Sequence, residues 1–114
     1  MNVVAGQEGE GQAVLLRSAR PVTGLETMRR NRKLGEKDRL ANLCNGPGKL
    51  TQALGVNKSH YGHRFHGPQL HLVDWGIRYA PEEISAGPRI GISQAKDFPF
   101  RFCVKNSPWL SRKA

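Results

Sequence analysis

The order of the apolar patterns along the chain is the feature that most limits its fold. Apolar residues recur at helical spacing between residues 23 and 55, whereas alternating, strand-like patterns dominate after residue 69. The chain does not alternate strands and helices in the βαβ order that builds a parallel sheet. With 114 residues it is long enough for one domain only. The sequence therefore predicts a single α+β domain with a mainly antiparallel sheet.

The best-formed helix signal is the segment GPGKLTQALGV, which begins at Gly46. Pro47 suits a first helical turn, and Gly55 is placed as a C-terminal cap. Leu50, Ala53 and Leu54 supply one apolar face. We expect a short amphipathic helix here, buried along that face.

Two weaker helices are predicted before it. Thr23 and Glu26 have the spacing of a capping box, and the helix that follows carries Leu25 and Met28 on one face. A second helical stretch covers about residues 36–44, with its leucines at helical spacing, and stops at Asn45-Gly46.

Short strands are predicted at residues 13–17, 70–75, 89–93 and 100–105. Loops are predicted at residues 6–12, which are rich in Gly and Glu, and at residues 57–69, which contain three of the four histidines. Phe100 and Phe102 alternate around Arg101, and we interpret both rings as core residues rather than base-stacking ones.

The charge balance points to an anionic partner. Eighteen Lys and Arg against nine Asp and Glu give a formal charge of +9. The basic residues are spread between aliphatic runs, unlike the like-charge blocks of disordered tails. A folded domain that binds a polyanion such as nucleic acid is therefore predicted.

Neither a membrane nor an oxidising compartment is indicated. No apolar stretch approaches the roughly 20 residues that span a bilayer, and the first residues do not read as a signal peptide. Cys44 and Cys103 lack a CxxC spacing, so both are expected to be buried thiols. We expect a monomer in the cytoplasm, at the nucleoid if bacterial, or in the nucleus if eukaryotic.

The segment Gly46-Pro47-Gly48-Lys49 is the first candidate site. Glycines at a helix start let a phosphate approach backbone amides, and the lysine adds a positive charge. The same residues also serve as a plain helix cap, and both interpretations stand at this point. The GxxxxGK[ST] spacing of a P-loop is absent, which argues against nucleotide hydrolysis.

Other chemistries have little support. The histidines have neither accompanying cysteines nor an HExxH frame, so no metal site is predicted. The acidic residues of the second half (Asp74, Glu82, Glu83 and Asp97) do not recur at a spacing typical of an acid and base pair. No GxSxG or other nucleophile motif occurs.

Five segments in order resemble the alkyladenine (3-methyladenine) DNA glycosylase family: QAVLLR, GLETMRRNR, GPGKLTQALGVNKS, GPRIGIS and PFRFCVKNSPWLSR. The resemblance covers nearly the whole chain, and the third and fifth segments are long enough to be specific. It implies a compact α+β domain around a curved antiparallel sheet with a concave basic surface for double-stranded DNA. It also implies base excision repair: an alkylated or deaminated purine is flipped out, and water activated by a carboxylate hydrolyses its N-glycosidic bond without metal or cofactor.

The resemblance assigns roles to five residues. Asn2 matches a base-pocket asparagine that crowds the exocyclic amino group of guanine. Arg17 matches an arginine near the catalytic water and the backbone of the flipped nucleotide. Gly46, Gly48 and Lys49 match a helix start that contacts the DNA backbone. This last assignment agrees with the phosphate interpretation of the same residues.

The family's general base, its intercalating aromatic residue and its base-stacking rings all correspond to positions before Asn2. We therefore assign no catalytic residue and expect residues 1–114 to be the C-terminal portion of one glycosylase domain. Loss of a general base lowers a rate by about 10² to 10⁴, so little or no excision is expected from these residues alone. A nonspecific DNA-binding module and a non-functional remnant with exposed strand edges are the alternatives.

Overall fold

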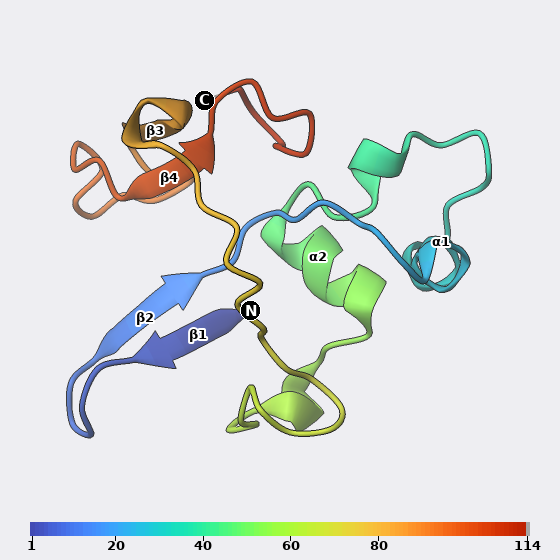
Figure 1. Ribbon diagram of the computed structural model, residues 1–114, viewed down its shortest axis with the longest axis horizontal. Helices are drawn as coiled ribbons and strands as arrows, with labels where there is room; N and C mark the ends of the chain where they lie inside the picture. The colour runs from blue at the N-terminus through green and yellow to red at the C-terminus, as the bar shows by residue number, and fades with distance from the viewer. Residues whose placement is uncertain (114) are drawn as a thin grey trace. The chain divides into compact units, whose positions relative to one another are not determined.

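The computed structural model describes residues 1–113, which contain two helices and two antiparallel hairpins (Figure 1). The predicted α+β class and the antiparallel pairing are confirmed. The residues group into two compact units. The first unit is Met1–Tyr61 with Trp109–Ser111, and the second is Gly62–Pro108 with Arg112 and Lys113. No described helix is long and apolar enough to cross a membrane.

The first unit opens with a hairpin of β1 (Asn2–Ala5) and β2 (Gln12–Leu15). Its register pairs Asn2 with Leu15 and Val4 with Ala13. The predicted loop between the strands is present, and Gly6 and Gly9 adopt positive φ there. The strand predicted at residues 13–17 is present as β2, but it begins one residue earlier and ends two residues earlier than predicted. The strand β1 was not predicted.

Helix α1 spans Leu25–Arg32, as predicted, but it does not begin with a capping box. Its N-cap is Gly24 in the left-handed conformation at φ 71°, and no side chain caps it. Because Gly24 is the N-cap, Thr23 lies one residue before the cap position. Leu25 and Met28 pack against the core together, which confirms their predicted face.

The predicted helix at residues 36–44 is wrong. Only Leu40–Asn42 form a 3₁₀ turn, and a tight loop precedes it. The Gly35 N–H donates to Asp38 Oδ2 at 2.8 Å, and Arg29 Nη1 donates to the Asp38 carbonyl at 2.9 Å. Side-chain bonds of this kind offer the backbone an alternative to helix, which explains the error.

Helix α2 spans Pro47–Leu54 and matches its prediction closely. Pro47 lies in the first turn, and Gly55 closes the helix at φ 69°. Leu50 and Ala53 are buried, as predicted, but Leu54 is 43% exposed and lies outside the core.

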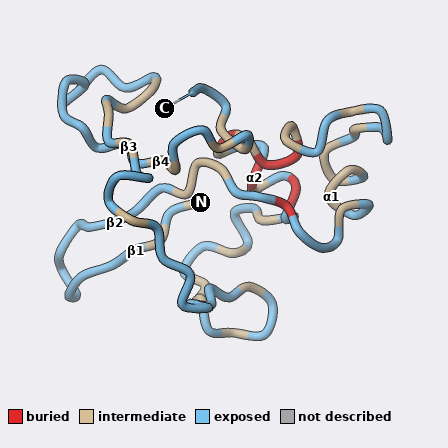
Figure 2. Tube along the Cα trace, turned by 45° about the horizontal axis from the view of Figure 1, so that its top comes forward, coloured by how far each residue is buried: buried red, intermediate tan, exposed pale blue. Residues whose placement is uncertain are grey.

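The buried core of the described residues lies entirely in the first unit, around α2 (Figure 2). It consists of Leu43, Cys44, Leu50 and Ala53, with Met1, Leu16, Leu25, Met28 and Leu34 packed against it. Arg32 joins α1 to this core: its guanidinium donates to the carbonyls of Leu43 and Asn42 at 3.1 and 3.2 Å and to Gln52 Oε1 at 2.7 Å. The Asn31 amide donates to the Ala53 carbonyl at 3.0 Å. These bonds fix the two helices against each other.

Cys44 is buried, as predicted, whereas Cys103 is only half-buried. Burial raises the pKa of the Cys44 thiol above its usual 9.0, and the Arg32 charge offsets part of this effect. The folded protein therefore keeps this thiol protonated at a pH where the unfolded chain ionises it. This contribution to stability is complete below about pH 9 and is lost as the pH rises through the raised pKa.

We expect iodoacetamide at pH 8 to modify Cys103 well before Cys44, because the thiolate is the reactive form. We also expect the free energy of unfolding to fall above pH 9, and to fall less steeply in the Cys44→Ala variant. Mass spectrometry of labelled peptides measures the labelling rates, and urea titrations at pH 7 to 10 measure the free energy of unfolding. Equal labelling rates for the two thiols would contradict this account of Cys44.

The second unit contains a 3₁₀ turn, Pro81–Glu83, followed by β3 (Ile84–Gly87) paired with β4 (Arg101–Val104). Strand β4 lies within the predicted strand 100–105. The predicted strand at 70–75 is wrong, since only an isolated bridge between His66 and His71 forms there. The predicted strand at 89–93 is also wrong.

Two findings explain the errors around residues 88–102. Pro88 cannot donate to a strand ladder, and pairing stops at Gly87 just before it. The chain then forms a loop in which Arg89 Nη2 donates to the Gln94 carbonyl at 2.8 Å. Phe100 and Phe102 are 57% and 69% exposed, so the interpretation of both rings as core residues is wrong.

Candidate nucleic-acid interface

Charge is segregated within the first unit. Residues 11–25 and 39–61 contain no Asp or Glu but hold five cations, Arg17, Arg20, Arg39, Lys49 and Lys58. The carboxylates of this unit lie instead at the β1–β2 turn and on α1 with its following loop. The Ala19 N–H donates to the Cys44 carbonyl at 3.2 Å, which joins the two carboxylate-free segments just before α2. The start of this helix therefore lies where two segments with cations and without carboxylates meet.

The first turn of α2 leaves backbone donors available. Pro47 has no N–H, and no side chain caps the helix start. A Cβ added at Gly48 would meet nothing within 4 Å, so open space lies over that position. Lys49 is exposed, and its Nζ donates to Asn45 Oδ1 at 3.0 Å. The free amides, the helix dipole and the lysine together suit an anion such as phosphate.

Gly46 needs a different explanation from Gly48. It is buried, and its φ of −169° is extended backbone that any residue adopts. A Cβ there would meet the Lys49 side chain at 3.5 Å, an ordinary contact. Internal packing therefore does not require glycine at position 46. A glycine at position 46 would still let a ligand approach the backbone closely.

Asn2 lies on β1, and Arg17 lies two residues beyond the end of β2. Asn2 pairs with Leu15, and Arg17 follows Leu15 by two residues. The Leu16 N–H donates to the Met1 carbonyl at 3.0 Å, which continues the pairing beyond β2. The hairpin therefore brings the chain just before Arg17 back beside the start of β1, although Asn2 and Arg17 are 15 positions apart in the sequence.

The surroundings of the two residues differ. Asn2 is exposed and Arg17 is half-buried. Within residues 1–113, the structure gives the Arg17 guanidinium no hydrogen bond or ion pair. Arg17 is also two residues before Ala19, whose bond to Cys44 leads to the start of α2. A charged donor without a partner among the described residues is thus two residues along the chain from the backbone bond to Cys44.

A further basic residue of this region was not predicted. The Arg20 guanidinium lies over the Trp109 ring, 6.0 Å from its centroid. The sequence did not indicate the contact between Arg20 and Trp109, because the two residues are far apart along the chain. Asn45, the partner of Lys49, was also missed, although its i,i+4 spacing to the lysine is a signal that the sequence contains.

Not every basic residue of this unit is available to a ligand. Arg32 is held by the three bonds described above, and Arg29 donates to the carbonyls of Gly35 and Asp38. Arg30 and Lys33 follow on α1, but Glu26 shares that helix and Glu36 and Asp38 lie in the loop after it. The remaining cations of that region thus lie close in sequence to carboxylates, whereas the start of α2 lies in a segment without any. The start of α2 is therefore the better anion site.

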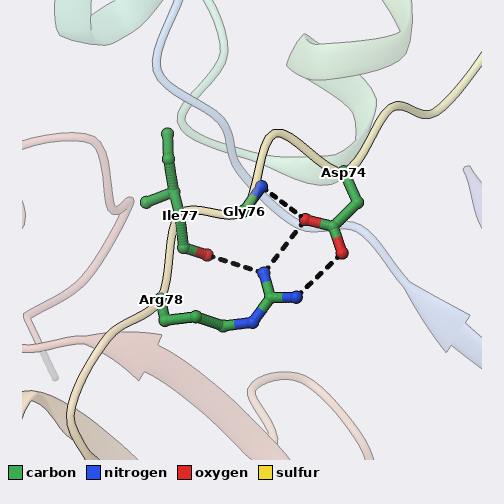
Figure 3. Close-up of polar contacts among 4 residues, drawn as sticks. All are labelled: Asp74, Gly76, Ile77 and Arg78. Carbon is green, nitrogen blue, oxygen red and sulfur yellow. Dashed lines mark hydrogen bonds and ion pairs between the residues drawn. The ribbon is translucent and has the colours of Figure 1, made fainter.

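The carboxylates of the described residues are poorly suited to general-base chemistry. Asp38 is half-buried and the others are exposed. Asp74 belongs to a closed turn in which Arg78 Nη2 pairs with Oδ2 at 2.9 Å and the Gly76 N–H donates to Oδ1 at 2.8 Å (Figure 3). The Arg78 hydrogen bond, with a smaller effect from Gly76, holds the Asp74 pKa below its usual value. A carboxylate with a lowered pKa is a weak base.

No metal centre is formed within the part of the chain that the structure describes, where no three His, Cys, Asp or Glu residues gather suitably. His66 and His71 meet only as an isolated backbone bridge. The arrangement in the first unit is thus one of backbone amides, a lysine, arginines and an asparagine. Its chemistry is that of anion binding.

Comparison with known proteins places the sequence in a family. A sequence profile of the methylpurine-DNA glycosylases matches residues 1–108. A relative from Rhodopseudomonas palustris strain BisB18 is 46% identical over 112 residues, which cover 98% of this chain and 53% of the relative. A relative from Bacillus licheniformis is 41% identical over 115 residues, covering 98% and 56% respectively. One from Nitrosospira multiformis is 41% identical over 112 residues, covering 98% and 55%.

All three relatives carry names that make them candidate 3-methyladenine DNA glycosylases. The chain spans about half the length of these curated relatives. The match extends through β1, β2, both helices and the β3–β4 hairpin. The chain belongs to the methylpurine-DNA glycosylase family.

Proposed function

We propose that residues 1–113 hold double-stranded DNA for a monomeric glycosylase that removes alkylated or deaminated purines, such as 3-methyladenine, in base excision repair. The reaction is hydrolysis of the N-glycosidic bond of a purine flipped out of the duplex. The relatives are bacterial, and in a bacterium the protein would act at the nucleoid. The observation that carries the proposal is the junction of the two carboxylate-free segments at the start of α2.

The start of α2 would bind the backbone of the duplex. A phosphate seated there accepts hydrogen bonds from the Gly48 and Lys49 amides, and the Lys49 ammonium neutralises its charge. Gly46 and Gly48 keep Cβ atoms away from the approaching strand. Binding of this kind positions the protein on the duplex without reading its sequence.

Arg17 and Asn2 would act at the flipped nucleotide. The Arg17 guanidinium, which has no partner within residues 1–113, suits the backbone of that nucleotide. Asn2, on the strand paired with β2, would present its side-chain amide to the base. Such an amide discriminates purines by the hydrogen bonds that it makes or denies at their exocyclic groups.

The chemical step needs a carboxylate that the described residues do not offer in a suitable setting. We therefore propose that the 114-residue chain binds duplex DNA but does not excise the base. The exposure of its carboxylates and the lowered pKa of Asp74 favour binding without excision. In this proposal, the general base of the glycosylase is not one of these residues.

Single-turnover excision with parallel binding tests the proposal. The purified chain is mixed in excess with a labelled duplex containing hypoxanthine, and abasic sites are cleaved by alkali. We expect no excision above the uncatalysed background. Binding measured by anisotropy should weaken with salt, with a log–log slope of about −0.9 for each phosphate neutralised. Rapid excision would mean that one of these carboxylates is the base, and salt-independent binding would refute the phosphate site.

A further inference from the structure

The Arg20–Trp109 pair has no role in the function proposed so far. Arg20 is exposed, and its guanidinium lies over the Trp109 ring at 6.0 Å. Trp109 is half-buried within the same unit, so its ring offers a supported surface. A cation over an indole ring is attracted by the ring quadrupole, and this attraction does not need a hydrogen-bond acceptor on the ring.

The contact with the ring leaves N–H donors of the guanidinium available. Arginine has five N–H donors in the plane of its fork, and that fork matches the oxygens of a phosphate. The structure gives Arg20 no hydrogen bond or ion pair to another of the residues 1–113, so the donors are not committed elsewhere. The ring fixes the group and reduces the side-chain entropy lost on binding an anion.

The position of Arg20 points to a particular anion. Arg20 follows Ala19, whose N–H is bonded to the Cys44 carbonyl, and Cys44 is two residues before Gly46. Neighbouring α-carbons are 3.8 Å apart, so the backbone of Arg20 lies near the start of α2. Phosphates recur along each DNA strand at about 3.4 Å of helix axis. A strand seated on α2 therefore has further phosphates at distances that the long Arg20 side chain can reach.

Charge supports the same conclusion. Arg20 lies in residues 11–25, which contain no carboxylate, and the segment 39–61 to which it is joined contains none either. No acidic residue neighbours Arg20 in either segment, and no ion pair to it forms among the described residues. An arginine with free donors in a carboxylate-free region is suited to an external anion.

We infer that Arg20, held on the Trp109 ring, is an additional DNA backbone contact that binds a phosphate beyond the one at the start of α2. This inference rests on the proposed function, because it assumes that a duplex lies there. Arg20 supplies charge and donors, and Trp109 positions them. The pair adds affinity and registers the duplex on the protein without selecting a base.

Salt titrations of duplex binding by Arg20 variants test the inference. We expect Arg20→Ala to weaken binding about tenfold near 0.1 M salt, as lost charged hydrogen bonds do. It should also reduce the magnitude of the log–log slope by about 0.9, the value for one phosphate. Arg20→Lys should restore most of the slope, because the charge remains, but less of the affinity, because the fork is lost.

Two further variants separate a DNA contact from a merely structural pair. Arg30→Ala removes an equal charge from α1 and should leave the slope within error of the parent. Trp109→Phe keeps a ring beneath the guanidinium and should keep the slope while lowering the affinity slightly. Urea unfolding of each variant reports stability independently, and a structural role alone would change unfolding but not the slope.

The failure of this inference is distinguishable from the failure of the proposed function. A steep slope for the parent chain with an unchanged slope for Arg20→Ala would overturn the Arg20 contact and leave the α2 site intact. A flat slope for the parent chain would overturn the proposed function and this inference with it. An equal reduction in Arg30→Ala would show that net charge, not the Arg20 site, determines binding, and would also overturn the inference.

Discussion

The double variant Arg17→Ala/Lys49→Ala is expected to lose about a hundredfold in affinity for duplex DNA. Each substitution removes a charged donor aimed at a phosphate, and such contacts contribute about tenfold each. The log–log salt slope should fall in magnitude by about 1.8, the sum for two phosphates. Both side chains are absent from the hydrophobic core, so the free energy of unfolding should change little. Fluorescence anisotropy at several salt concentrations measures the effect.

The matched control is Arg30→Ala/Lys37→Ala. It lowers the net charge of the chain by the same amount, but on α1 and its loop, where Glu26, Glu36 and Asp38 lie. We expect its affinity to change less than threefold, a loss typical of charges outside the contact. Equal losses in the two double variants would mean that the DNA responds to total charge rather than to the α2 site.

The variant Leu50→Ala is expected to lower the free energy of unfolding by about 2 to 5 kcal/mol, the range for leucine truncation in a packed core. Leu50 is 3% exposed and belongs to a small buried hydrophobic cluster with Leu43, Cys44 and Ala53. Total stabilities of about 5 to 15 kcal/mol are usual, so this loss is a large share. Because α2 presents the phosphate site, DNA binding should decline with folding. Urea titration followed by circular dichroism measures the change.

Leu54→Ala provides the control in the same helix. Leu54 is outside the core and 43% exposed. Its truncation removes the same atoms and should cost less than about 1 kcal/mol, since surface substitutions are usually small. If the two leucines proved equally costly, the core assigned to the first unit would be wrong.

The sequence predicted the start of α2 well because local rules determine it. Proline in the first turn, an apolar face and a glycine cap act within one short segment, so no distant contact was needed to find them. Leu54 was assigned to the core because periodicity gives the direction of a face but not its width. Only packing decides that Ala53 is covered and Leu54 is not.

The errors have a different origin. Residues 36–44 have helical spacing, but the Asp38 side chain bonds to the Gly35 N–H and holds a loop there. Phe100 and Phe102 alternate as core residues do, yet their hairpin has two strands only, and such a hairpin covers little surface. The inward position of Arg32 was not predicted, although the sequence contains a signal for it. Arg32 shares a helix face with Leu25 and Met28, which pack against the core.

The candidate site could be anticipated only in part. The positions of Asn2, Arg17, Gly46, Gly48 and Lys49 came from local motifs and from the resemblance, and their roles in DNA binding remain predictions. The sequence could not indicate that the Ala19–Cys44 bond joins two carboxylate-free segments, nor that Arg20 reaches Trp109. Both depend on contacts between residues far apart in the chain, which composition and spacing do not reveal.

A titration of the ¹⁵N-labelled chain with a short undamaged duplex tests the central claim most directly, because amide shifts report the binding surface residue by residue. The account predicts that the Gly48 and Lys49 amides shift most, together with residues near Arg17 and Arg20, and that these shifts recede as salt is added. The amides of residues 33–39 should change little. Large shifts confined to residues 33–39, with Gly48 and Lys49 unmoved, would contradict a DNA-binding site at the start of α2.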